Sequence, residues 1–259
     1  MGDPEKILNS RWYNFFNWVV RLVFVNIMAV LTPMIIGFGL MCPWLFIESS
    51  NIFFIIIAII GALSVIWLAI PSVCACYSLI KAWNEGSENN TFKPFYILYW
   101  RYLKELWLYE LIMIPVILVL AFGIYAYYKL MSNEGTWFVI GAIGFGVTAI
   151  LAWFVILAGV HLPACVATFR MRTMDLIKLT FINAFRMFPS SLLWFIIYYG
   201  VAALILVNSF FTPVYFIIGL ALSTYAVEML SHSKYAYLEA KITGQNANKT
   251  DKEDNNSNK

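Results

Sequence analysis

The amino-acid sequence predicts an all-α integral membrane protein with about six transmembrane helices, arranged as three hairpins. Of its 259 residues, 62% are apolar and only 12% are charged, and the mean hydropathy is +0.77. A soluble domain carries about 25% charged residues. The few charges are also clustered, so that five long stretches contain no Asp, Glu, Lys or Arg. This composition argues against a soluble enzyme, a nucleic-acid binder and a disulfide-rich secreted domain.

The uncharged stretches give the approximate bounds of the helices. They are residues 22–47, 49–80, 111–128, 135–169 and 187–227. A transmembrane helix needs roughly 20 apolar residues, so we expect one span in each of the first four stretches. The last stretch is long enough for two spans, divided at the polar turn 208–213, which ends in a proline. The expected spans are residues 18–46, 52–80, 106–129, 136–162, 189–208 and 213–233.

The basic residues predict the orientation of these spans. With the N-terminus in the cytoplasm, all of the 17 Lys and Arg residues except Lys129 fall on the inner side, as the positive-inside rule requires. Both termini are therefore expected to be cytoplasmic. Residues 1–241 form the expected polytopic membrane domain. Residues 242–259 contain no apolar face and are expected to be a disordered cytoplasmic tail.

Residues 91–104 form the most distinctive of the inner segments. At 100° per residue, Lys93, Arg101 and Lys104 fall on one side of a helix. The other sides are occupied by Phe95, Leu98, Tyr99 and Tyr102. A helix of this kind lies in the headgroup layer with its basic stripe toward anionic lipid. Two interpretations remain open, namely ordinary interfacial anchoring and a docking surface for a partner.

Ionisable residues inside a membrane are candidates for a functional site. Glu110 and Glu228 are the acidic residues closest to the expected spans, and each lies near the inner boundary. Both a structural ion pair and a substrate or ion site are open for them, and depth in the membrane favours Arg21 as the partner of Glu110. Asn26 and Asn208 are expected to form hydrogen bonds between helices.

Groups that support enzymatic or metal chemistry are scarce. Cys74 and Cys76 point about 200° apart on a helix, so they are expected to pack rather than to bind one metal ion. His161 and His232 are each interpreted as a hydrogen-bonded interfacial residue, with a proton relay as the alternative. No nucleotide-binding, hydrolase or metalloprotease motif occurs in the sequence. We therefore expect no metal site, no cofactor and no enzymatic activity.

Glycines in two of the expected spans permit close approach between helices. Gly37 and Gly39 lie in the first span, and Gly141, Gly144 and Gly146 lie in the fourth. Their spacings do not match the G-x-x-x-G dimerisation motif.

Two inner junctions of the chain resemble each other. Residues 71–77 (PSVCACY) and 163–169 (PACVATF) share a proline, an alanine and an aromatic residue at identical spacing. A Thr-Phe pair follows about 20 residues after each, at residues 91–92 and 180–181. An internal repeat and a coincidence of common membrane-helix residues both remain open as explanations.

Residues 10–110 resemble the YesL family of bacterial multi-pass membrane proteins, a domain of unknown function. The shared pattern consists of Arg21-Leu22, Asn26, Pro71, Ala75, Tyr77, residues 81–86 (KAWNEG), Phe92, Phe95 and residues 102–104 (YLK). Here Asn26 and Pro71 lie farther apart than in the family, so the first hairpin is longer. The resemblance implies a plasma-membrane protein associated with carbohydrate-uptake genes, and it supplies no catalytic residues.

Two functions follow as hypotheses from these observations. The first is a non-enzymatic accessory or regulatory component of carbohydrate uptake, whose partners are the lipid bilayer and subunits of a sugar importer. The second is a small transporter or channel in its own right. The sugar connection depends on the resemblance, whereas the second hypothesis depends on the repeat and on the carboxylates near the spans.

Overall fold

The computed structural model describes residues 11–45, 51–86, 91–132 and 134–257, and this part of the chain contains helices and no strand. Six of the helical segments are long and apolar enough to cross a membrane. The expected all-helical fold, with six helices long and apolar enough to span a membrane, is therefore confirmed for these residues. In chain order the elements are α2 (Arg11–Leu45), α3 (Asn51–Asn84), α4 (Phe92–Leu130), α5 (Thr136–Thr168), α6 (Thr173–Arg186), α7 (Phe188–Phe195), η1 (Ile196–Gly200), α8 (Val201–Val207), α9 (Phe211–Val214), η2 (Tyr215–Gly219) and α10 (Leu220–Ser257).

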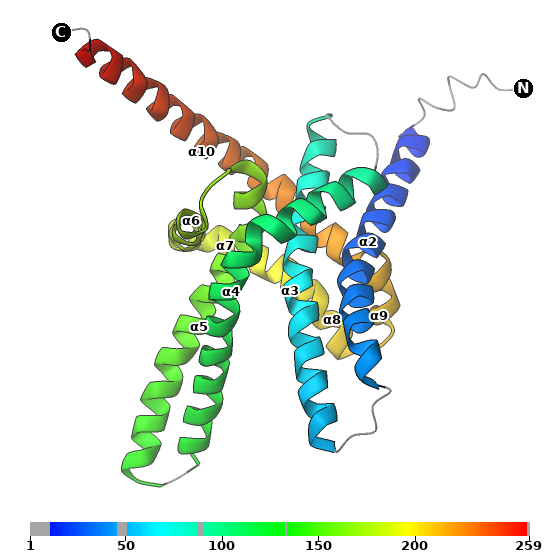
Figure 1. The fold of residues 1–259 in the computed structure, drawn as a ribbon, viewed down its shortest axis with the longest axis vertical. Helices are drawn as coiled ribbons and strands as arrows, with labels where there is room; N and C mark the ends of the chain where they lie inside the picture. The colour runs from blue at the N-terminus through cyan, green and yellow to red at the C-terminus, as the bar shows by residue number, and fades with distance from the viewer. Residues whose placement is uncertain (1–10, 46–50, 87–90, 133, 258–259) are drawn as a thin grey trace, which may run out of the picture.

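The long helices lie side by side in pairs and alternate in direction. Helix α2 packs along α3, and α4 packs along α5 (Figure 1). The start of α2 and the end of α10 lie at the same end of the molecule, and the ends of α2 and α4 lie at the opposite end (Figure 1). Both described chain ends therefore belong to one side of the bundle.

Helix α4 differs from the expectation for residues 91–104. These residues continue without a break into the third span, so the helix begins at Phe92 rather than near residue 106. Its only early proline, Pro94, lies in the first turn, where the missing N–H breaks no helical hydrogen bond. The side chains of Phe95, Tyr99 and Tyr102 are buried against the bundle, which adds a tertiary reason for the helix to continue.

The corresponding stretch after α5 is divided into two helices. Helix α6 ends at Arg186, and Met187 has a non-helical backbone (φ −108°, ψ 33°) before α7 begins at Phe188. Pro189 lies in the first turn of α7. A proline at this position cannot donate a hydrogen bond to the carbonyl of Phe185, and its ring would clash with that carbonyl in a continuous helix. Helix α6 therefore ends before it, and a new helix begins with Pro189 in its first turn.

The C-terminal segment also differs from the expectation. Helix α10 continues to Ser257 and projects away from the bundle, so residues 242–257 are helical where the sequence predicted a disordered tail (Figure 1). Extending an existing helix adds no nucleation cost, and Gly244 is the only strong helix breaker within residues 242–257. Residues 258–259 lie outside the described residues.

The buried core lies where α3, α5 and α10 meet the first half of α4. The second half of α4 and the first half of α5 form an outer arm, defined as residues 115–130 together with residues 136–154. Among the residues of the outer arm, only Gly141 is buried. The outer arm is apolar and exposed, and it projects from the core as a pair of helices (Figure 1).

Close helix approach depends on three of the five glycines that the sequence identified. A Cβ at Gly144 would overlap the ring of Tyr127, and a Cβ at Gly141 would lie 2.8 Å from the backbone N of Met131. A Cβ at Gly37 would lie 2.6 Å from a methyl group of Val65. The predicted role is confirmed at these positions. It is wrong at Gly39 and Gly146, where a Cβ would meet no atom within 4 Å.

Candidate functional site

The candidate site is a set of buried polar side chains where α3, α5, α7 and α10 meet. At its centre is His161, which is fully buried on α5. Its Nδ1 lies 2.8 Å from the hydroxyl of Tyr235, and its Nε2 lies 2.7 Å from Oγ of Ser191. The ring of Trp194 lies 4.7 Å away between centroids. The interpretation of His161 as a hydrogen-bonded histidine is supported, because both ring nitrogens have a partner.

The serine–histidine contact resembles half of a nucleophilic pair, but its surroundings are structural. Ser191 is fully buried, and its hydroxyl also lies 3.3 Å from the carbonyl of Ala184 and 3.0 Å from that of Met187. A nucleophile must reach its substrate and needs a base that a third group orients, usually a carboxylate. Here the third group is the hydroxyl of Tyr235. The contact therefore ties α7 to α5 and α10.

A second polar group surrounds the buried carboxylate of Glu228 on α10. Asn84 donates a hydrogen bond to its Oε2, and Nδ1 of His232 lies 3.0 Å from its Oε1. One turn later on the same helix, Oγ of Ser231 lies 2.6 Å from the hydroxyl of Tyr77. The groups that contact this carboxylate are therefore an amide and an imidazole.

A cavity of about 140 Å³ connects these two polar groups. Its lining carries both signs of charge and is formed by Tyr77, Lys81, Glu85, Thr168, Glu228, His232, Tyr235, Ala236 and Glu239. Because Tyr235 both lines the cavity and contacts His161, a hydrogen-bonded path joins the cavity to the buried histidine. The arrangement can hold a small polar molecule or relay a proton over this short path.

Glu110 stands apart from both groups. It is fully buried on α4, and neither carboxylate oxygen has a hydrogen-bond partner among the described residues. The expected pairing with Arg21 is wrong, because Cζ of Arg21 lies over the ring of Trp83, 6.0 Å from its centroid. Similar depth along two helices does not bring two side chains together when they point in different directions around their helix axes.

Asn26 stabilises an irregular helix, and its expected hydrogen bonds between helices are confirmed. Its amide nitrogen donates to the carbonyls of Tyr215 (3.1 Å) and Phe216 (2.7 Å), and its Oδ1 accepts from the N–H of Ala221 (2.8 Å). Tyr215 and Phe216 begin the π-helical turn η2, and Ala221 follows shortly after its end. The altered hydrogen-bond pattern of a π-helical turn leaves backbone groups in need of partners. For Asn208 the expectation is wrong, because its Oδ1 accepts from the nearby N–H of Phe210.

The residues of the family-like pattern are divided between the core and the surface. Pro71, Ala75 and Tyr77 are buried on α3, and Phe95 is buried on α4, whereas Phe92 is exposed. The pattern therefore describes how α3 and the first half of α4 pack together.

The basic stripe of α4 lies on the surface. Lys93 and Lys104 are exposed, and Nε of the half-buried Arg101 lies 2.9 Å from Oε1 of Glu105. Ile97 and Trp100 are exposed on the same side of the helix, at 58% and 52%. The stripe is thus a mixed basic and apolar surface, which suits both interfacial anchoring and the docking of a partner.

The cysteines and acidic residues of the described part of the chain do not form a metal site. No group of three His, Cys, Asp or Glu side chains there could hold a metal ion. Cys74, Cys76 and Cys165 are free and buried, and the thiol of Cys165 lies 3.6 Å from the hydroxyl of Tyr235. These three cysteines therefore pack in the core.

Sequence reasoning did not identify the partners of His161. Ser191 and Tyr235 are 30 and 74 residues away in sequence and lack a charge or a motif that would single them out. From the sequence one can expect only that a buried histidine has hydrogen-bond partners on neighbouring helices, without knowing which residues they are.

Comparisons of the chain with protein-family models, with curated proteins and with solved structures found no match. The resemblance to the YesL family stays a prediction.

Proposed function

We propose that the chain crosses the plasma membrane six times as three hairpins, with both termini in the cytoplasm. The placement of both described chain ends on one side of the bundle (Figure 1) supports this topology. The sequence positions of Lys and Arg support it too, because all except Lys129 fall in the segments expected on the inner side. Cysteine labelling at residues around Ser50 and Asn133 from outside, and around Asn89 from inside, tests it. A C-terminus labelled from outside would contradict the topology.

On this membrane scaffold, the proposed function is that of a non-enzymatic accessory or regulatory component of carbohydrate uptake. The observation that carries it is the exposed basic and apolar surface of α4, formed by Lys93, Ile97, Trp100 and Lys104. Its Lys side chains can pair with acidic groups, and Trp100 can supply buried contact area to a partner. The opposite side of the same helix packs into the core, so the surface is held rigidly.

Co-purification with the subunits of a sugar importer tests this function. The tagged chain should retain these subunits, and the double variant Lys93→Glu with Lys104→Glu should lose them because the charge of the surface is reversed. Lys129→Glu is the matched control, since this lysine lies at the other end of α4. Equal recovery with all three proteins would contradict the proposed docking surface.

A small transporter or channel is the second candidate, and Glu110 is the observation that favours it. A buried carboxyl group without a partner is costly, and such groups in membrane proteins often bind a proton or a cation. Vesicles that contain only this chain test the idea. Flux of a proton or sugar that Glu110→Gln abolishes would favour the transporter, and its absence would favour the accessory role.

A further inference from the structure

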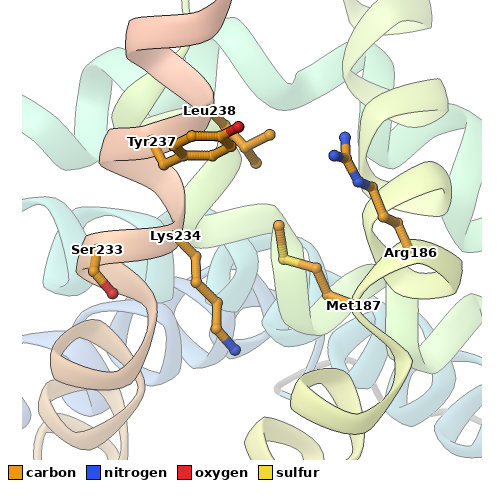
Figure 2. A pocket seen from close by; sticks show the side chains of 6 residues that line it. All are labelled: Arg186, Met187, Ser233, Lys234, Tyr237 and Leu238. Carbon is orange, nitrogen blue, oxygen red and sulfur yellow. The ribbon is translucent and has the colours of Figure 1, made fainter.

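A second pocket lies away from the polar site, between the end of α6 and the middle of α10. It has a volume of about 260 Å³, and its lining residues are Arg186, Met187, Ser233, Lys234, Tyr237 and Leu238. Figure 2 shows Lys234 and Tyr237 extending from α10 into the space that Arg186 and Met187 border on the other side. The volume is many times the roughly 15 Å³ that one water molecule needs.

The charge of this lining has one sign. It contains a guanidinium and an ammonium group but no carboxylate, whereas the smaller cavity near His161 is lined by Glu85, Glu228 and Glu239. Arg186 also lies in the last turn of α6, where the negative end of the helix dipole favours a cation. Because this end of a helix repels anions, the attraction for a bound anion must come from side chains. Planar guanidinium and compact ammonium groups are the common protein ligands of phosphate.

Lys234 is held in place at the edge of the pocket. Its ammonium group donates to Oγ of Ser190 at the start of α7, and it lies 5.8 Å from the centroid of the Trp194 ring. An ammonium group has three donors, so this contact leaves others for a ligand. The contact also joins α7 to α10 directly beside the pocket.

Exposed apolar side chains lie one turn deeper on the two helices, α7 and α10, that the Lys234–Ser190 contact joins. One turn deeper than Ser190 on α7 is Leu193, and one turn deeper than Lys234 on α10 is Leu230. Both are exposed, at 46% and 44%. A cationic pocket with an exposed leucine one turn deeper on α7 and another on α10 has the order of chemical groups found in a phospholipid, with phosphate at the interface and acyl chains below.

We propose that this pocket binds the phosphate headgroup of an anionic phospholipid, with Arg186 and Lys234 as its phosphate ligands and Leu193 and Leu230 against its acyl chains. Tyr237, 65% exposed at the rim, is placed to donate a hydrogen bond to the headgroup. The bound lipid would join α6, α7 and α10 at the point where the chain breaks between α6 and α7. This inference does not depend on the proposed role in carbohydrate uptake.

Native mass spectrometry of the purified full chain in detergent tests the proposal. Phosphatidylglycerol should be retained in preference to phosphatidylcholine. Arg186→Gln should lower the retained phosphatidylglycerol about tenfold, because one charge-assisted hydrogen-bond donor is lost. Arg186→Lys should retain most of the lipid, and Lys178→Gln, which removes another exposed cation from α6, should retain all of it.

A second variant and a competition experiment complete the test. If Arg186→Gln does not fold, Tyr237→Glu introduces a carboxylate at an exposed position of the rim and should reduce lipid retention as strongly. Inorganic phosphate at millimolar concentration should not displace the lipid. Equal retention of the two lipids, equal losses in Arg186→Gln and Lys178→Gln, or displacement by inorganic phosphate would overturn the assignment.

Discussion

The core region and the outer arm are both built from largely apolar helices, but they differ in how they are held together. In the core region, helices are joined by buried polar contacts such as those of His161, Asn26 and Glu228. In the outer arm, α4 and α5 meet through Gly141 and Gly144, and large apolar side chains such as Phe122 (71% exposed) point outward. Hydrogen bonds between buried polar side chains therefore hold the core region together, and close backbone approach at glycines holds the outer arm together.

This difference reflects the solvent that surrounds each region. Lipid is as apolar as a leucine side chain, so apolar burial alone gives little reason for membrane helices to associate. Association then comes from van der Waals packing at small residues and from hydrogen bonds between helices. Exposed apolar residues on the outer arm are consistent with contact to lipid, and their hydropathy says nothing about which helix they pack against.

The largest expected effect comes from matched phenylalanine truncations in the two regions. Phe95→Ala removes a fully buried ring that stacks on Tyr99 at 6.2 Å, so it should lower the free energy of unfolding by about 2–4 kcal/mol through the cavity it leaves. Phe122→Ala in the outer arm should change it by less than about 0.5 kcal/mol. Unfolding in detergent measures both, and equal losses would remove the distinction between the two regions.

A loss of about 2–3 kcal/mol is expected for Asn26→Leu. The substitution deletes three hydrogen bonds and leaves the carbonyls of Tyr215 and Phe216 without their side-chain donor. Asn14→Leu is the control, because Asn14 is exposed on the same helix. Equal melting temperatures for the two variants would show that η2 is stable without Asn26.

A glycine pair tests the packing of the outer arm. Gly144→Leu should cost about 1–3 kcal/mol, because a side chain there would overlap Tyr127 and force α4 and α5 apart. Gly146→Leu should be close to neutral, since nothing lies within 4 Å of its Cβ position. Disulfide crosslinking between cysteines placed on α4 and α5 measures the separation, and unchanged crosslinking in Gly144→Leu would contradict the role of this glycine.

Among the buried polar side chains, the smallest effect is expected for Glu110→Gln, whose free energy of unfolding should stay within about 1 kcal/mol of the wild type. Neither carboxylate oxygen has a partner to lose, whereas Glu228→Gln weakens contacts with Asn84 and His232 and should cost about 1–3 kcal/mol. A double-mutant cycle should give additive effects for Arg21 and Glu110. A coupling energy above about 1 kcal/mol would contradict this prediction and would support an ion pair between Arg21 and Glu110.

The sequence predicted the helical regions well and the contacts between them poorly. Uncharged stretches located all six candidate spans, because lipid tolerates few charges along the length of a helix. The helix bounds were less accurate at Phe92 and Met187, where packing of Phe95 and the proline at 189 decided whether the chain continued or broke. Of the candidate site, Glu228, His161 and Asn26 were identified, but their partners were not.

The sequence by itself determined the class of protein, the number of candidate spans and the depth of each ionisable residue. These properties depend on position along a helix, which is proportional to residue number. Only the tertiary structure decided that Arg21 lies over Trp83, that His161 joins Tyr235 to Ser191, and that Arg186 and Lys234 line one pocket. Such contacts depend on how each helix is rotated about its axis and which helix lies beside it. When the helices are apolar on nearly every side, hydropathy predicts neither the rotation of a helix about its axis nor which helix is its neighbour.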